Sequence, residues 1–301
     1  MTISRLLINA TKQLKESLIE DPAYEAGLIL SYAINKPEYF IYLHPDNEIE
    51  ASYADSFQSF VDRRCNHEPY CYITGNSEFM SLDFKVNPKV LIPRSDTETL
   101  AEAALYALGC DMPFVSRDMF QLPSYSRQEE RRVLDIGTGS GCLAVSIARY
   151  AVNVKVDALD VCEMALQVAK ENAKENGVIG NIRFIQSDFV KDTGVAYPPY
   201  DLIISNPPYI PLQELSQLPP DVKDYEPHLA LFAGNDGLDF YRRIAFEAAR
   251  LLKGDGIIVV ECGYDQAGSI RDIFRSYDME TTTLKDLSGI ERVIAARLNV
   301  Y

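Results

Sequence analysis

The 301-residue chain lacks the cysteine patterns that indicate metal or disulfide sites. Its six cysteines are scattered along the chain as Cys65, Cys71, Cys110, Cys142, Cys162 and Cys262. No two of them form the C-x-x-C pair that is typical of zinc sites and redox motifs. We therefore expect neither a metal site nor a disulfide framework, and a cytoplasmic location is the simplest prediction.

Long apolar segments are also absent from the sequence. No run approaches the roughly 20 apolar residues that a membrane-spanning helix needs, and residues 1–5 do not have the pattern of a signal peptide. With 47% hydrophobic residues, the composition is that of a globular protein. We expect no membrane partner, and a chain of this length can form two domains.

The third absence is a long basic segment. The chain has 29 Lys and Arg against 44 Asp and Glu, a formal net charge of -15. Adjacent arginines occur only as isolated pairs, such as Arg131-Arg132 and Arg242-Arg243. Because nucleic-acid-binding proteins neutralise phosphates with a basic face, this charge disfavours a nucleic acid as the partner.

What the chain does contain is the segment Asn206-Pro207-Pro208-Tyr209, directly after the apolar run at 202–204. A planar amide or amino nitrogen is a poor nucleophile because its lone pair is delocalised. A carboxamide oxygen and a backbone carbonyl can accept its two N–H bonds and turn it towards an electrophile. The prolines restrict the backbone that carries these acceptors, and a tyrosine ring offers a face to a flat group. We interpret the segment as catalytic for N-methylation; a plain proline turn is the alternative.

A second motif runs from Asp135 to Gly141 with the spacing D-x-G-x-G-x-G. It joins a predicted strand at 132–134 to a helical pattern through Leu143 and Ile147. Glycines let a ligand approach the backbone closely, and the helix N-terminus presents free N–H groups. A dinucleotide-binding turn would read G-x-G-x-x-G, whereas an acid before the first glycine suits a ligand with a cationic amino group. The motif favours S-adenosylmethionine, and a glycine turn of an unrelated α/β domain is the alternative.

Two more acids follow predicted strands. A strand at 154–159 ends at Asp160, about 20 residues beyond the glycine turn, where an acid binds ribose hydroxyls. Asp157, inside the same strand, is the competing candidate. A third strand at 182–185 precedes Asp188-Phe189, a carboxylate and a ring that suit an adenine base.

Each of these acids alone fits a solvated strand end, but their shared position predicts one site. Open α/β sheets bind ligands along the carboxyl edge of their strands. The polar residues at such ends are Asp135, Asp160, Asp188 and Asn206. We therefore predict an α/β domain with a ligand site at that edge.

The N-terminal region has helical patterning throughout residues 2–74. Apolar residues at helical spacing, Leu6, Leu7, Ala10, Leu14 and Leu18, predict one apolar stripe. We predict a small helical domain over residues 1–75 that recognises a partner, because the catalytic motifs lie elsewhere.

The remaining boundaries follow from changes in pattern. Residues 79–86 and 90–92, around a proline turn, predict a β-hairpin within a linker at 76–96. A catalytic domain would then occupy 97–301, with 109–130 as a surface loop.

Three features are expected in the C-terminal half. An amphipathic helix at 238–252 would be capped by Gly254. The proline-containing loop at 210–226 would shape the substrate pocket. Residues 281–284 and 292–298 would form an antiparallel pair.

Together these motifs resemble the peptide chain release factor glutamine N5-methyltransferases, the HemK/PrmC family. The similarity covers nearly the whole chain, in the segments Glu68-Pro69, Leu91 to Glu98, Asp135 to Gly141, Asn206 to Tyr209, Glu226-Pro227 and Gly237-Leu238-Asp239. The sequence N-P-P-Y alone is shared with DNA adenine methyltransferases, whereas L-I-P-R is much more particular to the release factor enzymes. Ser95 stands where the family has proline, and Phe189 where many members have tryptophan.

The resemblance implies a Rossmann-like class I S-adenosylmethionine-dependent methyltransferase domain, preceded by a small helical domain and a β-hairpin linker. The implied cofactor-binding residues are Asp135, Gly137, Thr138, Gly139, Ser140, Gly141, Asp160, Asp188, Phe189 and Asn206. The implied substrate-binding residues are Asn206, Pro207, Pro208 and Tyr209, of which Asn206, Pro207 and Tyr209 are catalytic.

The implied substrate is the glutamine of the Gly-Gly-Gln motif of class I release factors, and the second product is S-adenosylhomocysteine. The alternative is a nucleic-acid adenine N6-methyltransferase, which would need base flipping and a basic groove. A third interpretation is a non-catalytic protein that keeps the cofactor fold, which the intact Asn206 motif argues against.

Overall fold

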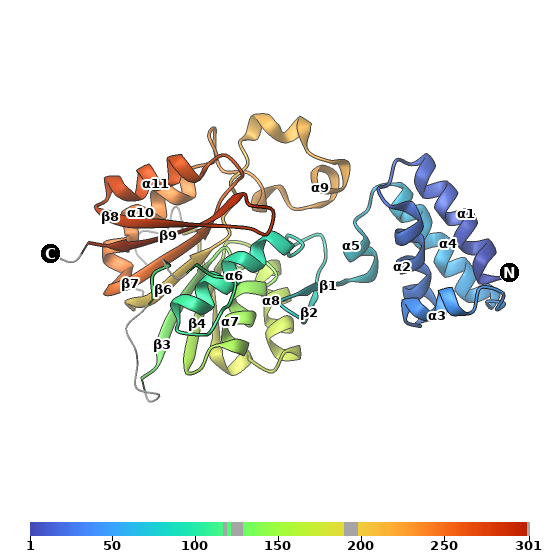
Figure 1. Ribbon diagram of the computed structural model, residues 1–301, viewed down its shortest axis with the longest axis horizontal. Helices are drawn as coiled ribbons and strands as arrows, with labels where there is room; N and C mark the ends of the chain where they lie inside the picture. The colour runs from blue at the N-terminus through green and yellow to red at the C-terminus, as the bar shows by residue number, and fades with distance from the viewer. Residues whose placement is uncertain (117–118, 122–128, 190–197, 300–301) are drawn as a thin grey trace. The chain divides into compact units, whose positions relative to one another are not determined.

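The computed structural model describes residues 1–116, 119–121, 129–189 and 198–299 (Figure 1). Contacts divide the chain into two compact units. The first comprises residues 1–76 and 218–225, and the second comprises residues 77–217 and 226–301. The hairpin region therefore groups with the second unit, and a short segment from the C-terminal half belongs to the first.

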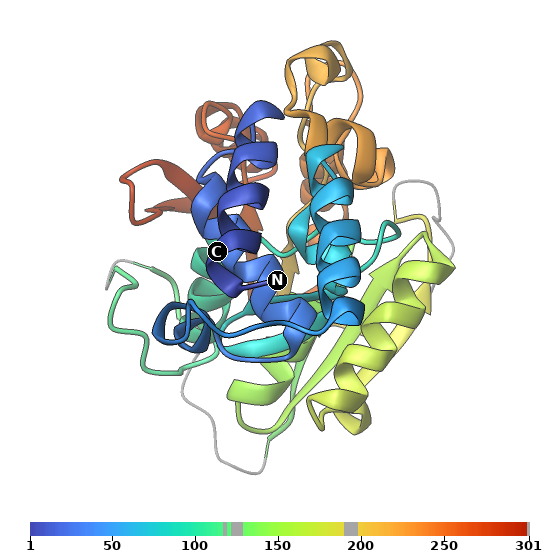
Figure 2. The ribbon, with the colours of Figure 1, turned by 90° about the vertical axis from the view of Figure 1, so that its right-hand side faces the viewer.

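The first unit is a bundle of short helices. They are α1 (Ile3–Glu16), α2 (Pro22–Ile34), α3 (Glu38–Leu43), α4 (Ala51–Cys65), α5 (Tyr70–Thr74) and α9 (Pro220–Tyr225). Three residues of the predicted stripe, Leu6, Ala10 and Leu14, are buried in its core, which also contains residues of α2 and α4. The blue helices α1 and α2 lie side by side in Figure 2. Leu18 is exposed and does not continue the stripe, contrary to the prediction, because α1 ends at Glu16 and Leu18 turns the chain with a φ of 59°.

The second unit is built on a seven-stranded sheet. Its strands are β3 (Arg131–Ile136), β4 (Val154–Asp160), β5 (Ile182–Gln186), β6 (Tyr200–Ser205), β7 (Leu252–Glu261), β8 (Met279–Lys285) and β9 (Glu291–Leu298). Their order is β5-β4-β3-β6-β7-β9-β8. The pairs from β5 to β7 are parallel, and β9 runs antiparallel to both β7 and β8. The predicted α/β class and the predicted final antiparallel pair are both confirmed.

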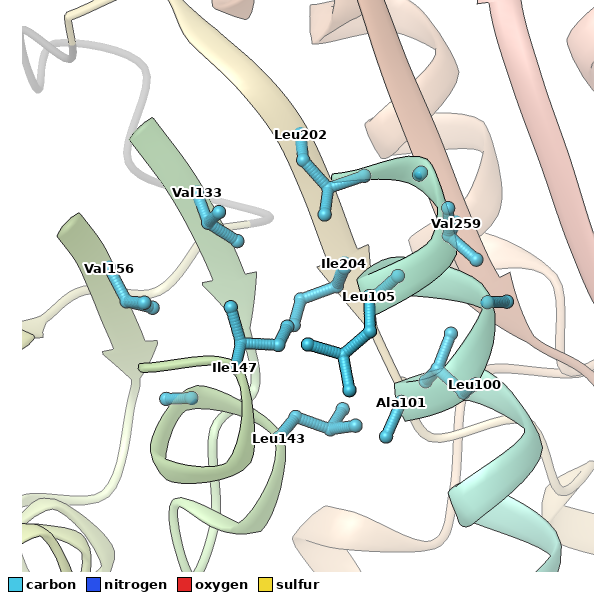
Figure 3. Close-up of a cluster of buried hydrophobic side chains, with 14 of the residues drawn as sticks. Leu100, Ala101, Leu105, Val133, Leu143, Ile147, Val156, Leu202, Ile204 and Val259 are labelled. Carbon is cyan, nitrogen blue, oxygen red and sulfur yellow. The ribbon is translucent and has the colours of Figure 1, made fainter. Parts of the chain in front are cut away.

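Helices cover both faces of this sheet. They are α6 (Ser95–Ala107), α7 (Cys142–Tyr150), α8 (Glu163–Glu175), α10 (Asp239–Leu251) and α11 (Ala267–Ser276). Successive side chains of a strand point to opposite faces, so Val133 packs with α6 and α7 whereas Leu134 packs with α10 and α11. Figure 3 shows the first of these clusters, with Leu105 and Ile147 meeting Ile204 of the central strand. Because both faces are covered, β6 and β7 contain continuous apolar runs, at 202–204 and 257–260.

The β-hairpin lies earlier in the chain than predicted. Its strands are β1 (Asn76–Phe79) and β2 (Leu82–Lys85), and residues 90–92 form no strand. The turn is Met80-Ser81, with φ values of 51° and 59°. Two successive left-handed residues make the tight turn that suits a hairpin, but neither residue is the glycine or asparagine that marks such turns in a sequence.

Three further expectations need correction. Gly254 does not cap α10, because the helix ends at Leu251 and β7 starts at the next residue. Segment 210–226 is not simply a loop, since it contains the 3₁₀ helix Leu212–Gln217 and α9. In the described part of the expected surface loop at 109–130, Val115, Met119 and Phe120 are buried in the core; positions 117–118 and 122–128 lie outside the described residues.

Candidate active site

A cavity of about 410 Å³ lies at the carboxyl ends of β3, β4, β5 and β6 in the second unit. This volume falls within the roughly 300–1,000 Å³ of small-molecule sites. The four polar residues predicted for this edge do lie at it. Asp135 is the second-last residue of β3, Asp160 is the last residue of β4, and Asn206 directly follows β6. Asp188 comes two residues after β5.

The cavity brings together most of the predicted site residues, although not all of them. Its lining includes Gly137, Gly139, Asp160, Asp188, Phe189, Asn206, Pro207 and Pro208. The predicted residues outside the lining are Asp135, Thr138, Ser140, Gly141 and Tyr209.

The glycine turn is fixed by hydrogen bonds to the end of β4. The backbone N–H groups of Gly137 and Thr138 donate to the Leu159 carbonyl at 2.9 and 2.8 Å. The Asp160 carboxylate accepts from the N–H of Gly139 at 2.9 Å. Gly137 and Gly139 have φ values of 75° and 54°, which favour glycine. The turn therefore places backbone, without side chains, against the cavity.

Asp135 supports this turn from outside the cavity. Its side chain is fully buried, and it accepts a hydrogen bond from the Thr138 hydroxyl at 2.6 Å. Burial raises the pKa of Asp135 to about 7, and the hydrogen bond from Thr138 only partly opposes this effect. Gly141 has a packing role, because a Cβ atom there would come within 3.0 Å of Ala169 on α8.

Asn206 is held by two residues that sequence reasoning missed. Its Nδ2 donates to the hydroxyl of Thr97 on α6 at 3.1 Å. Thr97 and Asn206 also lower the pKa of Glu261, the last residue of β7, by side-chain hydrogen bonding. Glu261 Oε2 is buried and has no hydrogen-bond partner among the described residues. Glu261 is 2% exposed, and burial raises its pKa to about 7. The sequence contains one signal for Glu261, because this acid directly follows the apolar run at 257–260.

Tyr209 packs away from the cavity. Its ring contacts the core cluster beneath α10 and α11, and burial raises the pKa of its hydroxyl. Its backbone carbonyl accepts a hydrogen bond from Gln266 Nε2 at 2.8 Å. A role for this ring against the substrate stays a prediction.

One wall of the cavity comes from a segment that was not predicted. Residues 227–234 contribute Pro227, Leu229, Ala230, Phe232, Ala233 and Gly234, whereas the expected segment 210–226 contributes none of the lining. The wall is anchored at its start, where Arg94 Nη2 and the buried Glu226 Oε1 lie 2.5 Å apart. It is anchored further along by the N–H of Ile210, which donates to the Leu231 carbonyl at 2.9 Å.

The described residues hold no cluster of three or more His, Cys, Asp and Glu placed to bind a metal ion. Within the same residues, no helix has the length and apolar character needed to cross a membrane.

Comparison with known proteins identifies two family matches within the chain. Residues 5–75 match the PrmC N-terminal domain, and residues 119–217 match the methyltransferase small domain. The chain is 37% identical over 300 residues to the release factor glutamine methyltransferase of Moorella thermoacetica, with 98% of each protein covered.

Two other likenesses are more limited. The chain is 35% identical to the bifunctional methyltransferase of Rickettsia felis over 97% of its own length but only 57% of that protein, so it spans little more than half of this relative. Among solved structures, the catalytic domain of hMettl16 in complex with the MAT2A 3'UTR hairpin 1 has a TM-score of 0.55 and 16% identity, covering 85% of this chain and 84% of that one. At that identity the likeness shows the fold alone.

Proposed function

Because this chain belongs to the release factor glutamine methyltransferase family, we propose that it methylates the side-chain amide nitrogen of a glutamine in class I release factors, at the Gly-Gly-Gln motif. The methyl donor is S-adenosylmethionine, and S-adenosylhomocysteine is the second product. One observation carries the proposal: Asn206 lines the same cavity as Asp160 and two residues of the glycine turn, Gly137 and Gly139.

The cavity residues fit S-adenosylmethionine. Nothing lies within 4 Å of the position that a Cβ atom of Gly137 would take, so that side of the turn is open to a ligand. Asp160 supplies a carboxylate for the ribose hydroxyls, and the buried Phe189 supplies an aromatic wall for the adenine. When bound, the cofactor supplies an electrophilic methyl group on a sulfonium sulfur.

The chain's own residues bind and orient the substrate amide. The Asn206 side-chain oxygen and the Pro207 carbonyl accept its two N–H bonds, which turns the nitrogen lone pair towards the methyl group. The same two oxygens stabilise the positive charge that develops on the nitrogen. Because the proton leaves after the new bond has formed, this route needs no strong base. The helical first unit is proposed to recognise the release factor.

The test uses the purified protein, S-adenosylmethionine and two substrates in separate reactions: an unmodified class I release factor and adenine-containing DNA. Peptide mass spectrometry is expected to find one added methyl group on the Gly-Gly-Gln glutamine, with the DNA unmodified. A release factor with glutamate at that position is the matched control, since it has no amide nitrogen to methylate. Methylated adenine together with an unmodified release factor would overturn the proposal.

A further inference from the structure

Thr97 and Glu261 lie on the nitrogen side of the Asn206 carboxamide. Ser205 of β6 pairs in register with Val260 of β7, so the next residues, Asn206 and Glu261, leave neighbouring parallel strands together. Thr97 approaches from the first turn of α6. Thr97 and Glu261 are each 2% exposed, which places their contacts with Asn206 out of water.

The donors and acceptors of these three side chains determine which way the amide points. An ionised carboxylate only accepts hydrogen bonds, and a threonine hydroxyl has a single hydrogen to donate. Asn206 Nδ2 donates to the Thr97 hydroxyl at 3.1 Å. Both side chains also lower the pKa of Glu261 by hydrogen bonding, while Glu261 Oε2 is buried without a hydrogen-bond partner among the described residues. The hydroxyl hydrogen and the second amide hydrogen therefore both go to Oε1 of the carboxylate, the oxygen that is not left without a partner. This arrangement uses both N–H bonds of Asn206 and leaves its oxygen for the cavity.

We propose that Glu261 and Thr97 are positioning residues that hold the Asn206 carboxamide with its oxygen towards the substrate amide. The inference rests on the proposed function and deepens it. If the carboxamide rotated by half a turn, its oxygen would face the carboxylate, and it could accept from the Thr97 hydroxyl only if that hydroxyl gave up its bond to Glu261. It would also present an N–H₂ group to a substrate that itself offers N–H bonds. The orientation that accepts from the substrate is thus fixed before the substrate arrives.

The ionised form of Glu261 enforces this orientation. In the described part of the chain Glu261 forms no ion pair, because the nearby Arg292 is engaged by Asp96 and Asp286 at 3.0 Å each. Burial raises the pKa of Glu261 to about 7. A proton on Glu261 would make it a donor that competes with the amide and the hydroxyl. The titratable or charged groups that face Glu261 are Asp96 on α6, Cys142 on α7, Tyr209 beyond β6, Tyr241 on α10, Arg292 on β9 and the adjacent Cys262.

The first experiment compares Glu261→Gln with Glu247→Gln. Glu247 is a matched control, a buried carboxylate on α10 that pairs with Arg243 and Arg250. Glutamine at 261 removes the charge and can present either oxygen or nitrogen to Asn206. We expect kcat for glutamine methylation to fall about 10-fold to 100-fold, because a misplaced reacting group costs about that much. Calorimetry should give an unchanged cofactor Kd, which also shows that the variant is folded, and Glu247→Gln should keep the wild-type kcat.

The pH profile separates positioning from a purely structural role. Wild-type kcat should fall on the acid side with a midpoint near 7 as Glu261 becomes protonated, and Glu261→Gln should lack this acid limb. In a second comparison, Thr97→Ser keeps the hydroxyl and should retain more kcat than Thr97→Val.

Wild-type kcat and an unchanged acid limb in Glu261→Gln, or equal kcat in the two Thr97 variants, would overturn the positioning role alone. A wild-type enzyme that leaves the glutamine unmethylated would overturn the proposed function as well.

Discussion

The carboxylate of Asp160 accepts a hydrogen bond from the backbone N–H of Gly139 at 2.9 Å, which joins the end of β4 to the glycine turn after β3. Its other oxygen accepts from the N–H of Cys162, also at 2.9 Å. Since each oxygen already has a backbone donor, the carboxylate is fixed in the cavity wall, and each oxygen keeps a second lone pair for a ligand hydroxyl.

Asp160→Asn should weaken cofactor binding about tenfold or more. An asparagine is neutral and has one oxygen instead of two, so one hydrogen bond from a ribose hydroxyl to a charged oxygen is lost, and its N–H₂ group would face a backbone donor. The loss of a hydrogen bond to a charged group costs about 1.5–3 kcal/mol, and each 1.4 kcal/mol is about tenfold in Kd. The measurement is cofactor titration by calorimetry. Asp157→Asn is the control, because Asp157 instead accepts from Tyr200 and Arg183; a larger loss of affinity in Asp157→Asn than in Asp160→Asn would contradict the assignment.

Asn206→Ala should reduce kcat while leaving the cofactor Kd nearly unchanged. The substitution removes the oxygen that accepts from the substrate amide but leaves the glycine turn and Asp160 intact. Loss of one such polar group from a catalytic site typically costs about 10²–10³ in kcat. Single-turnover methylation of the release factor with saturating cofactor measures the effect. Near-normal turnover would mean that the amide is held by other groups.

Asp135 should make the stability of the fold depend on pH. Its pKa is about 7 in the folded protein and about 3.9 in an unfolded chain. A raised folded pKa means that the stability contributed by this carboxyl group is fully present below about pH 4 and is lost as the pH rises through about 7. Asp135→Asn, which is neutral at every pH, should therefore have a higher unfolding midpoint than the wild type at pH 8.

Thermal unfolding at pH 5, 6, 7 and 8 checks this prediction. The informative quantity is the unfolding midpoint of the variant minus that of the wild type. Burial also raises the pKa of Glu261, but Glu261 is present in both proteins, so its effect cancels in this difference. The difference in unfolding midpoint between the two proteins should become smaller as the pH falls. A constant difference across this range would show that the Asp135 carboxyl group does not titrate as its burial indicates.

The parts of the site that the sequence revealed are those that local patterns encode. Asp160 and Asn206 could be placed because each follows an apolar strand, and parallel strands bring their carboxyl ends to one edge. Thr97 could not be placed in this way, because it meets Asn206 across 109 residues of chain. The wall at 227–234 depends on a non-local bridge between Ile210 and Phe232. Pairings of this kind leave no periodic signal near either partner.

The same distinction applies to the fold. Runs of apolar residues predict the strands of the sheet, and apolar residues at helical spacing predict the helix after the glycine turn. Segment 218–225 joins the first unit through contacts such as the Tyr225 hydroxyl, which donates to the Asn66 carbonyl at 2.7 Å. The residues of this segment are mostly polar or proline, so their pattern predicts a loop. The pattern does not indicate to which unit the segment belongs.

Breaking the ion pair between Arg94 and Glu226 should loosen the cavity wall. The Glu226 side chain is 1% exposed and that of Arg94 is 39% exposed. Removal of one partner from a fully buried pair costs about 3–5 kcal/mol, but solvent around Arg94 reduces this cost. Because Glu226 directly precedes the wall residues, Arg94→Met should raise the cofactor Kd about fivefold, which corresponds to about 1 kcal/mol.

Two further variants make the result of Arg94→Met specific to this wall. Lys85→Met breaks an exposed pair with Glu175, whose atoms lie 3.7 Å apart and whose side chains are 48% and 52% exposed. An exposed pair contributes about 0–1 kcal/mol, so this control should leave the Kd unchanged. Arg94→Lys keeps the charge but cannot reproduce the planar guanidinium geometry, and its Kd should lie between those of the wild type and Arg94→Met. An equal Kd for Arg94→Met and Lys85→Met would show that residues 227–234 keep their position without this ion pair.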